Sequence, residues 1–300
     1  MSNSKDLKKK MKATAKSGRE ALIQDMDKGV LSISPKMDMG LSGGIQEGSW
    51  VLIQGPKKVG KTVLTQNIIR SAIKEGRKVF YFFTEERVQT KNLAAFPDEI
   101  LDSELFTVFT SEENNILSGE DILNIIIDLL KDSENRGSVM IVDSYSHLVP
   151  ADQMEHDVSP KIRDQKARML NSFCNKAAPL VRLSNCIMIG ILHLIHKMNL
   201  SNPKQNPLHA DCGEKIQYQT DYIINTYQQK PKFINDVGKI AEGTDKKVGL
   251  INNWDIFCSP LGPPKKVEGA ITYFDTGPDE ITELIQLDRD WETKNIPIVN

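Results

Sequence analysis

The chain has 300 residues, of which 39% are hydrophobic and 26% charged, so its composition is that of a folded globular protein and excludes an intrinsically disordered one. Its 38 lysines and arginines nearly balance 40 aspartates and glutamates, so a polyanionic partner would need a local basic patch. The longest central apolar run, Cys186 to Ile195, is about half as long as a membrane-spanning helix, which predicts no membrane partner.

The first 35 residues predict a basic helical arm ahead of the main domain. Apolar residues recur at roughly helical spacing at Leu7, Met11, Ala15, Leu22 and Met26. Gly18 interrupts this pattern, so a solvated tail fits the segment as well. There is no apolar signal region before Gly40, and the four cysteines are far apart, so we expect a cytoplasmic protein.

Apolar runs alternate with helical stretches from Trp50 onward. In chain order, strands are expected at Trp50–Gln54, Val79–Phe83, Val139–Val142 and Cys186–Leu192, with helices at Thr62–Glu75, Ile122–Lys131 and Lys161–Leu183. Because these strand runs are apolar without alternation, they predict an α/β fold with a mostly parallel sheet and helices on both faces. Further strands are predicted at Tyr222–Tyr227, Lys247–Ile256 and Ala270–Phe274, and we expect antiparallel strands toward the carboxyl terminus.

A phosphate-binding loop is predicted between the first strand and the helix that follows it. The pattern GxxxxGK[ST] is matched by Gly55, Pro56, Lys57, Lys58, Val59, Gly60, Lys61 and Thr62. Glycines let backbone N–H groups converge on phosphate oxygens, and the following helix directs its positive end at the anion. Lys61 is expected to neutralise the β- and γ-phosphates of ATP, Thr62 to ligate Mg²⁺, and Val63 to complete the nucleotide contacts.

Two carboxylates, Glu85 and Glu86, come directly after the strand Val79–Phe83. Ligands of parallel sheets lie beyond the carboxyl ends of the strands, so both side chains are expected to face the phosphates. Glu85 is the preferred general base for the attacking water because it stands closer to the strand end, although spacing alone does not decide between the two. A solvated helix cap is the alternative.

The strand Val139–Val142 leads into Asp143 and Ser144. An apolar strand that ends in an aspartate, about 80 residues after a phosphate-binding loop, is typical of a Walker B strand. Asp143 is therefore expected to hold Mg²⁺ through water, with Ser144 beside the nucleotide.

The order of these motifs resembles the RecA family of ATPases. The likeness extends over residues 36–287 and includes the segment Leu41–Gly48 and the helix that carries Lys166-Ala-Arg168-Met169. Within the family, the sequence is most similar to RecA and the phage recombinase UvsX. The resemblance implies a RecA-like P-loop core at 36–287, an oligomerisation role for the arm at 1–35, and a short tail at 288–300.

The resemblance also implies a γ-phosphate sensor after the strand Cys186–Leu192, at His193. UvsX-like proteins carry histidine at this place, and an imidazole can donate to a phosphate oxygen and report charge. Together with Glu85 and Lys61, His193 completes the predicted catalytic set. On the residue alone, a histidine in an apolar strand is more often a satisfied core residue.

Two DNA-binding loops follow from the same resemblance, the first at Pro150–Ile162 and the second at Ile195–Gly213. The basic side chains in and beside them that are expected to hold DNA phosphates are Arg163, Arg168, His196, Lys197, Lys204 and Lys215. Such contacts are independent of base sequence and sensitive to salt. Solvated surface charge is the alternative for each of these residues.

One segment departs from the family pattern. A late Lys-Asn-Lys segment in RecA reaches the neighbouring subunit's ATP, whereas the matching stretch here, Ile251–Asp255, contains no lysine. A cation acting on the neighbouring subunit would have to come from elsewhere, with Lys246, Lys247, Lys265 and Lys266 as the open choices.

The resemblance implies an ATP- and Mg²⁺-dependent DNA recombinase that acts in homologous recombination and in recombination-dependent repair or replication. Its subunits would hydrolyse ATP in a DNA-dependent manner, form a helical filament on single-stranded DNA and pair it with duplex DNA. Single-strand-binding and loader proteins are the further partners expected. The alternatives are a ring-forming ATPase similar to the DnaB helicase core or KaiC, and a protein in which ATP binding only licenses assembly.

Overall fold

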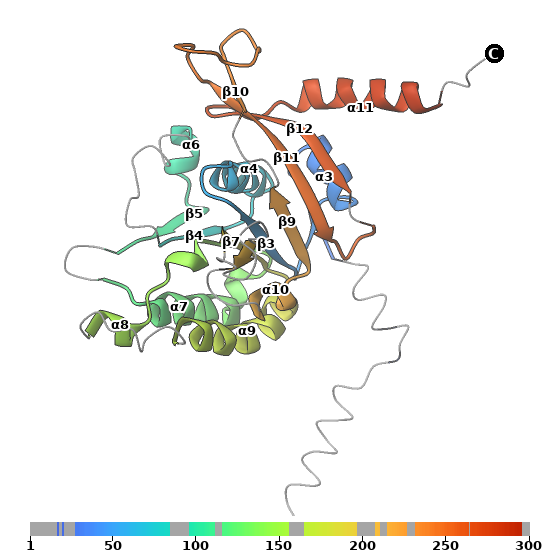
Figure 1. The fold of residues 1–300 in the computed structure, drawn as a ribbon. Helices are drawn as coiled ribbons and strands as arrows, with labels where there is room; N and C mark the ends of the chain where they lie inside the picture. Colours follow the sequence, from blue (N-terminus) through green and yellow to red (C-terminus); the bar gives the residue numbers. More distant parts are fainter. Residues whose placement is uncertain are drawn as a thin grey trace, which may run out of the picture.

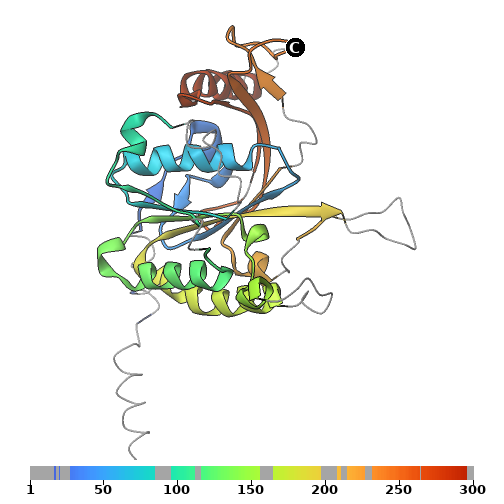
Figure 2. The ribbon, with the colours of Figure 1, turned by 90° about the vertical axis from the view of Figure 1, so that its left-hand side faces the viewer.

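The computed structural model describes residues 17, 20, 28–84, 96–111, 116–155, 165–196, 208–210, 215–226, 232–263 and 265–295. They form an α/β fold in which one large sheet separates two layers of helices (Figure 1). Figure 2 shows this sheet edge-on, with helices above and below it. The fold class expected from the sequence is therefore confirmed.

The middle of the sheet is parallel. In chain order its strands are β3 (Trp50–Gly55), β4 (Val79–Phe83), β5 (Phe106–Phe109), β6 (Val139–Asp143), β7 (Ile187–His196) and β9 (Tyr222–Thr226). They lie side by side in the order β9-β3-β7-β6-β4-β5, with every neighbouring pair parallel. All of their carboxyl ends therefore meet at one edge, where a parallel sheet places its ligands.

Antiparallel strands extend the sheet beyond β9. They are β11 (Gly249–Cys258), β12 (Lys266–Tyr273) and β13 (Gly277–Pro278), while β10 (Lys232–Ile234) pairs with β11 and β8 (Leu208–Ala210) pairs with β7. A separate two-stranded sheet joins β1 (Val30–Leu31) to β2 (Ile45–Gln46). The prediction of antiparallel strands toward the carboxyl terminus is confirmed.

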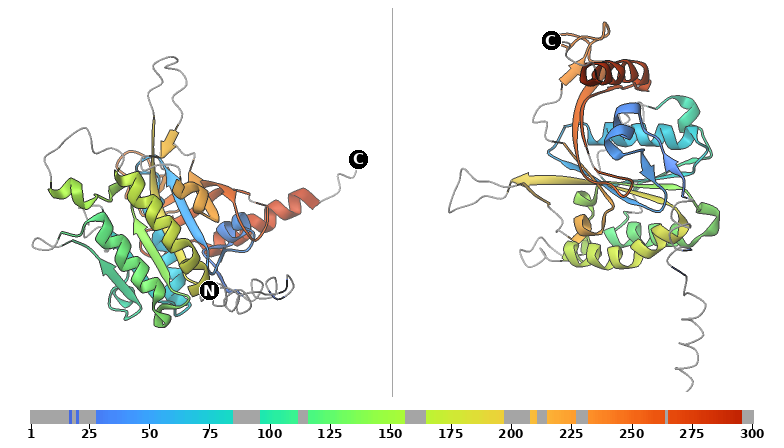
Figure 3. Two further views of the ribbon diagram at one scale, coloured as in Figure 1. Left: turned by 90° about the horizontal axis from the view of Figure 1, so that it is seen from below. Right: turned by 90° about the vertical axis from the view of Figure 1, so that its right-hand side faces the viewer.

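Helices cover both faces of the sheet. One layer contains α3 (Pro35–Leu41), α4 (Lys61–Lys74) and α6 (Asp98–Leu101), and the other contains α7 (Gly119–Lys131), α8 (Ala151–Glu155), α9 (Gln165–Ser184) and α10 (Lys215–Gln219). Short 3₁₀ turns occur at η1 (Ser133–Asn135) and η2 (Tyr145–His147). The last helix, α11 (Glu280–Asn295), lies beside α3 and extends away from the sheet (Figure 3).

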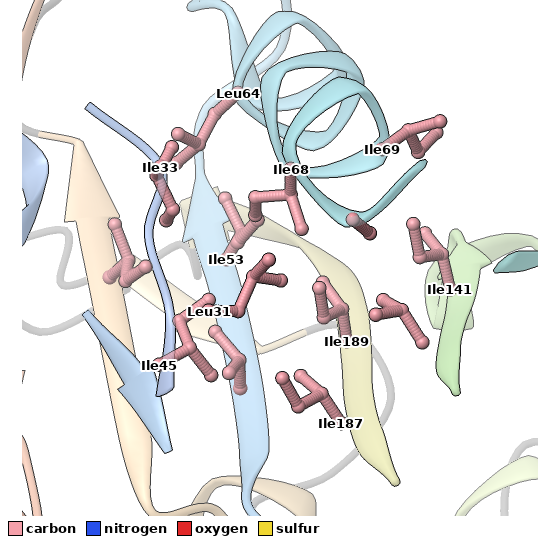
Figure 4. Packing of buried hydrophobic residues seen from close by; sticks show 14 of the residues in the cluster. Leu31, Ile33, Ile45, Ile53, Leu64, Ile68, Ile69, Ile141, Ile187 and Ile189 are labelled. Atoms are coloured by element: carbon pink, nitrogen blue, oxygen red, sulfur yellow. The ribbon is translucent and has the colours of Figure 1, made fainter. Parts of the chain in front are cut away.

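The central strands are apolar on both sides because each face of the sheet has its own core. In β3, Val51 and Ile53 pack toward α4, whereas Trp50 and Leu52 pack toward α7 and α9. Figure 4 shows the first core, in which α4 side chains lie over the strands; its labelled members include Ile53, Leu64, Ile68, Ile69, Ile141, Ile187 and Ile189. This two-sided burial explains why the strand runs lack a period of two.

Some predicted bounds differ from the observed ones. Helix α7 begins at Gly119, three residues before its predicted start, because Ser118 and Asp121 form a reciprocal capping box. Strand β7 continues to His196 and pairs with β8, so both ends of the predicted second loop contain strand residues.

The packed elements also cross the two predicted domain boundaries. Leu31 and Ile33 are buried in the core although they precede residue 36. Helix α11 continues to Asn295, past the predicted start of the tail, and the carboxylate of Asp279 caps its first turn by accepting from the Thr282 N–H at 3.1 Å. The role of the arm in oligomerisation concerns residues that lie largely outside the described ranges and stays a prediction. Within those ranges, no helix has both the length and the apolar character that crossing a bilayer requires.

Candidate nucleotide-binding site

The predicted phosphate-binding loop connects the end of β3 to the start of α4. Gly60 stands at the N-cap position of α4 in a left-handed conformation, with φ of 94°, and no side chain caps the helix there. The first N–H groups of a helix have no partner within the helix, and they carry its positive end. The loop therefore has the backbone arrangement that binds a phosphate.

Close packing behind the loop requires glycine at both of its ends. A Cβ on Gly60 would lie 2.5 Å from Asn252 Nδ2, and one on Gly55 would lie 2.3 Å from Thr226 Cγ2. Strands β9 and β11 therefore press directly against the loop. Val59 is buried and anchors the middle of the loop in the protein.

The lysines of the loop fall into two groups. Lys61 is only 5% exposed, and its Nζ donates to the backbone oxygens of Gly55 at 3.0 Å and Pro56 at 2.6 Å. Lys57 and Lys58 are exposed at the tip of the loop. One ammonium group is thus held inside the loop while two more add positive charge at its surface, an arrangement suited to a polyphosphate.

The hydroxyl of Thr62 and the carboxylate of Asp143 lie together, as the two motifs predict. Thr62 Oγ1 donates to Asp143 Oδ2 at 3.2 Å, and Asp143 is buried at the end of β6. Oxygen ligands of this kind are the ones that Mg²⁺ prefers. The donor set therefore fits a Mg²⁺ ion held by Thr62 and Asp143.

Sequence reasoning missed a third residue at this point, Tyr81 in the middle of β4. Its buried hydroxyl donates to the same oxygen, Asp143 Oδ2, at 2.9 Å. The signal was a tyrosine in an otherwise apolar strand, because a buried phenol needs a hydrogen-bond partner. The Asp143 carboxylate is thus oriented from two sides.

Ser144 is fully buried and joins β6 to the end of β4. Its backbone N–H donates to Thr84 Oγ1 at 2.7 Å, its carbonyl accepts from the same hydroxyl at 2.7 Å, and its own Oγ lies 2.8 Å from His147 Nδ1. The direct nucleotide contact expected of Ser144 stays a prediction. Glu85, which follows Thr84, and Glu86 lie outside the described residues.

His193 stands next to the phosphate-binding loop. In the parallel register of β3 and β7, it is the partner of Gly55. Its backbone N–H donates to Ser146 Oγ at 2.8 Å, and its ring meets that of His147 edge to face, with centroids 5.1 Å apart. Burial, with the positive charge of Lys61 as the next cause, lowers the pKa of His193 to about 4, so the imidazole is neutral at neutral pH. A neutral ring still donates one N–H to a phosphate oxygen.

The predicted DNA contacts are described in part. Arg168 is exposed on α9, and Lys215 on α10 donates from Nζ to Asn175 Oδ1 of α9 at 2.8 Å. Arg168 and Asn175 are about two turns apart, so they lie on the same side of α9. The backbone of His196 ends β7. The remaining predicted contacts, Arg163, Lys197 and Lys204, lie outside the described residues.

The described contacts of Ile251–Asp255, which replaces the family's Lys-Asn-Lys segment, lie within the same chain. Asn252 is buried against Gly60, and Asn253 Oδ1 accepts from the Gly269 N–H at 2.8 Å. Among the lysines left open as substitutes, Lys247 lies over the ring of Phe233, with its Nζ 4.6 Å from the ring centroid.

Residues 6–257 match the family described as the RecA N-terminal domain. Similar proteins include the mitochondrial DNA repair protein recA homolog of Dictyostelium discoideum, which is 26% identical over 262 residues, covering 86% of this chain and 53% of that protein. The DNA repair protein recA homolog 3, mitochondrial, of Arabidopsis thaliana is 26% identical over 250 residues, covering 82% of this chain and 53% of its own length. Protein RecA of Acholeplasma laidlawii is 24% identical over 260 residues, covering 85% of this chain and 71% of its own length.

The chain thus spans about half the length of the two mitochondrial relatives that it matches. The family match, by contrast, covers most of this chain and includes the phosphate-binding loop, Asp143 and His193. The chain therefore belongs to the RecA family.

Proposed function

We propose that the chain is an ATP-dependent DNA recombinase. Its subunits would bind ATP and Mg²⁺, assemble as a filament on single-stranded DNA and pair that strand with homologous duplex DNA. The kinship with the phage recombinase UvsX that the sequence implies belongs to the same proposal. So do a location in the host cytoplasm and partners that bind single strands or load the recombinase.

The observation that supports this proposal most strongly is the pairing of Gly55 with His193 in neighbouring strands. Gly55 begins the phosphate-binding loop, and His193 lies three residues before the end of β7, beyond which lies most of the predicted second DNA loop. A single strand therefore connects the nucleotide site to a predicted DNA contact. This continuity favours an ATPase whose grip on DNA depends on its nucleotide.

Nucleotide binding would use the loop and the start of α4. The N–H groups at the start of α4 would donate to phosphate oxygens, and Lys61 would exchange its bonds to Gly55 and Pro56 for bonds to phosphate. Thr62 and Asp143 would hold Mg²⁺, and Tyr81 would keep the Asp143 carboxylate in place. When bound, Mg²⁺ neutralises charge on the β- and γ-phosphates.

Hydrolysis would need a base that orients water, and we assign this role to Glu85. Thr84, the residue before it, donates from its backbone N–H to the carbonyl of Asp143 at 2.9 Å, and its hydroxyl binds the Ser144 backbone. These bonds attach the chain segment that leads to Glu85 to the end of the Walker B strand. They support a position for Glu85 near the terminal phosphate.

Coupling to DNA would pass through His193. The neutral imidazole would donate to the γ-phosphate, and cleavage and release of that phosphate would remove this contact. The carboxyl end of β7 would then be free to move, and the DNA-binding loops would lose the conformation that favours DNA binding. The filament would hold DNA in the ATP state and loosen after hydrolysis.

Electron microscopy of the protein with Mg²⁺ and a slowly hydrolysed ATP analogue, with and without single-stranded DNA, tests the proposal. We expect helical filaments that form with the analogue and lengthen with DNA, and short or absent filaments with ADP. Closed rings would support the helicase-like alternative, and an oligomer that ignores DNA would support ATP-licensed assembly. Either result would contradict the proposed function.

A further inference from the structure

The 3₁₀ turn η2 occupies a central place between the nucleotide site and the helix next to the predicted first DNA loop. It begins directly after Ser144, the residue that binds Thr84 at the end of β4. It also touches β7 on one side and the start of α9 on the other. The middle residue of the turn, Ser146, makes the hydrogen bonds to both, and it is 8% exposed.

The contact with β7 is tight. Ser146 Oγ accepts the backbone N–H of His193 at 2.8 Å. One residue earlier, the Tyr145 ring lies flush against Gly190, where a Cβ would come within 1.9 Å of Tyr145 Cε2. Because β7 and η2 pack with no space between them, a shift of the backbone at His193 must move Ser146 as well.

The contact with α9 is a charge-assisted hydrogen bond. Lys166 Nζ donates to the backbone carbonyl of Ser146 at 2.6 Å, and Lys166 is partly buried. Lys166 is the second residue of α9, and Arg168, a predicted DNA contact, follows two residues later on the exposed surface. The bond therefore connects Ser146 to the part of α9 that begins just after the predicted first DNA loop.

We propose that Ser146 and Lys166 are positioning residues that couple His193 to the start of α9. The two bonds of Ser146 form one continuous route: His193 backbone, Ser146 side chain, Ser146 carbonyl, Lys166 ammonium. This inference rests on the proposed function and extends it, because it gives the first DNA loop a route to the phosphate sensor that leaves β7 at His193 and does not pass through the second loop. In this role both residues would act through His193 and α9 rather than by direct contact with ATP or DNA.

The route is tested with two pairs of variants of the full chain. Ser146→Ala removes the acceptor for the His193 N–H, and Ser146→Thr restores a hydroxyl. Lys166→Met removes the donor to the Ser146 carbonyl, and Lys166→Arg restores one. Lys176→Met is the matched control, because Lys176 is an exposed lysine further along the same helix. Circular dichroism spectra equal to that of the unmodified chain show that each variant folds.

The first measurement needs no DNA. Hydrogen exchange of the first two turns of α9 is compared between the states with an ATP analogue and with ADP. We expect a difference in protection in the unmodified chain, in Lys176→Met and in the two restoring variants, and a loss of that difference in Ser146→Ala and Lys166→Met. An unchanged difference in the last two variants would overturn the inference even if DNA binding proves to be the wrong function.

The second measurement is the ratio of single-stranded DNA affinities in the ATP-analogue and ADP states. We expect this ratio to fall at least about fivefold in Ser146→Ala and in Lys166→Met, the size of a typical allosteric coupling. Since both residues belong to one route, the double variant should lose little more than either single variant. Additive losses would contradict a shared route.

Salt dependence separates positioning from direct DNA contact. If Lys166 itself bound a DNA phosphate, Lys166→Met would weaken binding equally in both nucleotide states and lower the slope of log affinity against log salt by about 0.7. A positioning role predicts an unchanged slope with a changed ratio. A lowered slope with an unchanged ratio would overturn the inference, whereas equal DNA affinities in the two nucleotide states of the unmodified chain would overturn the proposed function itself.

Discussion

The parallel and antiparallel parts of the sheet differ in what they contribute. In the parallel part, β3, β6 and β7 end at one edge and bring Lys61, Asp143 and His193 to the same place. In the antiparallel part, β11 alternates, with Leu250, Asn252, Trp254 and Ile256 buried and the residues between them more exposed. The first part carries the predicted chemistry on its strand ends, and the second covers one side of it.

The antiparallel part also supports the phosphate-binding loop from behind. Asn252 and Leu250 lie against Gly60, and Thr272 Oγ1 of β12 accepts from Asn67 Nδ2 of α4 at 2.8 Å. Arg70 of α4 donates to the carbonyl of Phe274 at 2.9 Å. The helix that starts at the phosphates is therefore held by strands that are distant in sequence. Changes in the parallel part should affect chemistry first, and changes in the antiparallel part should affect stability first.

The largest effect is expected for Lys61→Ala in the parallel part. Loss of the ammonium group should lower ATP turnover by at least about 100-fold, because it removes electrostatic stabilisation of the phosphates. Steady-state ATPase assays with single-stranded DNA measure this. Lys74→Ala, an exposed lysine at the other end of the same helix, should leave turnover near its original value. Turnover that survives the Lys61 change would show that the phosphate site is assigned wrongly.

Gly60→Ala tests whether the two parts are in contact where the structure places them. An alanine at position 60 would have to adopt a left-handed φ, and its Cβ would clash with Asn252 and Leu250. Gly76→Ala also places an alanine at a left-handed φ, of 75°, but its Cβ would have open space around it. We expect Gly76→Ala to cost about 1–2 kcal/mol of unfolding free energy from the backbone alone. Gly60→Ala should cost about 1–3 kcal/mol more and should weaken nucleotide binding.

The double variant Gly60→Ala with Asn252→Ala should recover part of that additional loss, because it removes one of the clashing side chains. Denaturant titration and binding of a fluorescent ATP analogue measure the two quantities. Equal losses of unfolding free energy in Gly60→Ala and Gly76→Ala would mean that β11 does not pack against the loop.

Thr272→Val tests whether the antiparallel strands stabilise α4, and it changes no residue assigned to the nucleotide site. The substitution keeps the shape of the side chain but leaves the buried Asn67 Nδ2 without its acceptor, which should cost about 2 kcal/mol. Denaturant titration measures the loss, and the ATPase rate per folded molecule should change little. Thr276→Val, at an exposed position nearby, should stay within about 0.5 kcal/mol. A Thr272 variant that keeps its stability but loses ATP turnover would contradict the expectation that changes in the antiparallel part affect stability first.

The smallest effect is a contrast in pH dependence. The folded pKa of His193, about 4, is below its ordinary value of 6.5, so the unfolded chain takes up the proton first and stability falls as pH drops from 6.5 toward 4. Burial raises the pKa of Glu283 above 4.5, so its contribution has the opposite sign and stability falls as pH rises through the folded pKa. For His193, the change in unfolding free energy over this pH range should be on the order of 1 kcal/mol once solvent screening is allowed for.

Unfolding free energies between pH 4 and 7 for His193→Gln and Glu283→Gln check these signs. His193→Gln should reduce the loss of unfolding free energy as the pH is lowered. Glu283→Gln should reduce the loss of unfolding free energy as the pH is raised toward neutral. The same direction of change in both variants would contradict the assigned shifts.

The sequence predicted the parallel part better than the antiparallel part, for physical reasons. A strand such as Val79–Phe83 is buried on both faces, so its apolar run marks its bounds without reference to any neighbour. The loop from Gly55 to Thr62 was predictable because phosphate binding needs particular residues at fixed spacing. Local sequence was sufficient in both cases.

Elements and contacts that depend on distant residues were missed. Helix α11 carries a local signal, the cap at Asp279, but its attachment depends on buried Glu283, which accepts from the backbone N–H of Lys36 at 3.0 Å. The bonds of Tyr81 to Asp143 and of Lys166 to Ser146 connect residues that are 62 and 20 positions apart. No periodicity or spacing rule encodes such pairs, because the fold alone brings them together.

The central claim is that the nucleotide bound at the ends of β3 and β7 controls the affinity for DNA. Its most direct test is the affinity for single-stranded DNA, at one salt concentration with Mg²⁺, in the presence of an ATP analogue and of ADP. The account predicts binding at least about fivefold tighter with the analogue. It also predicts that His193→Ala abolishes this difference while nucleotide affinity stays nearly intact. Equal DNA affinity in both nucleotide states, or a large loss of ATP affinity in His193→Ala with the DNA difference preserved, would contradict it.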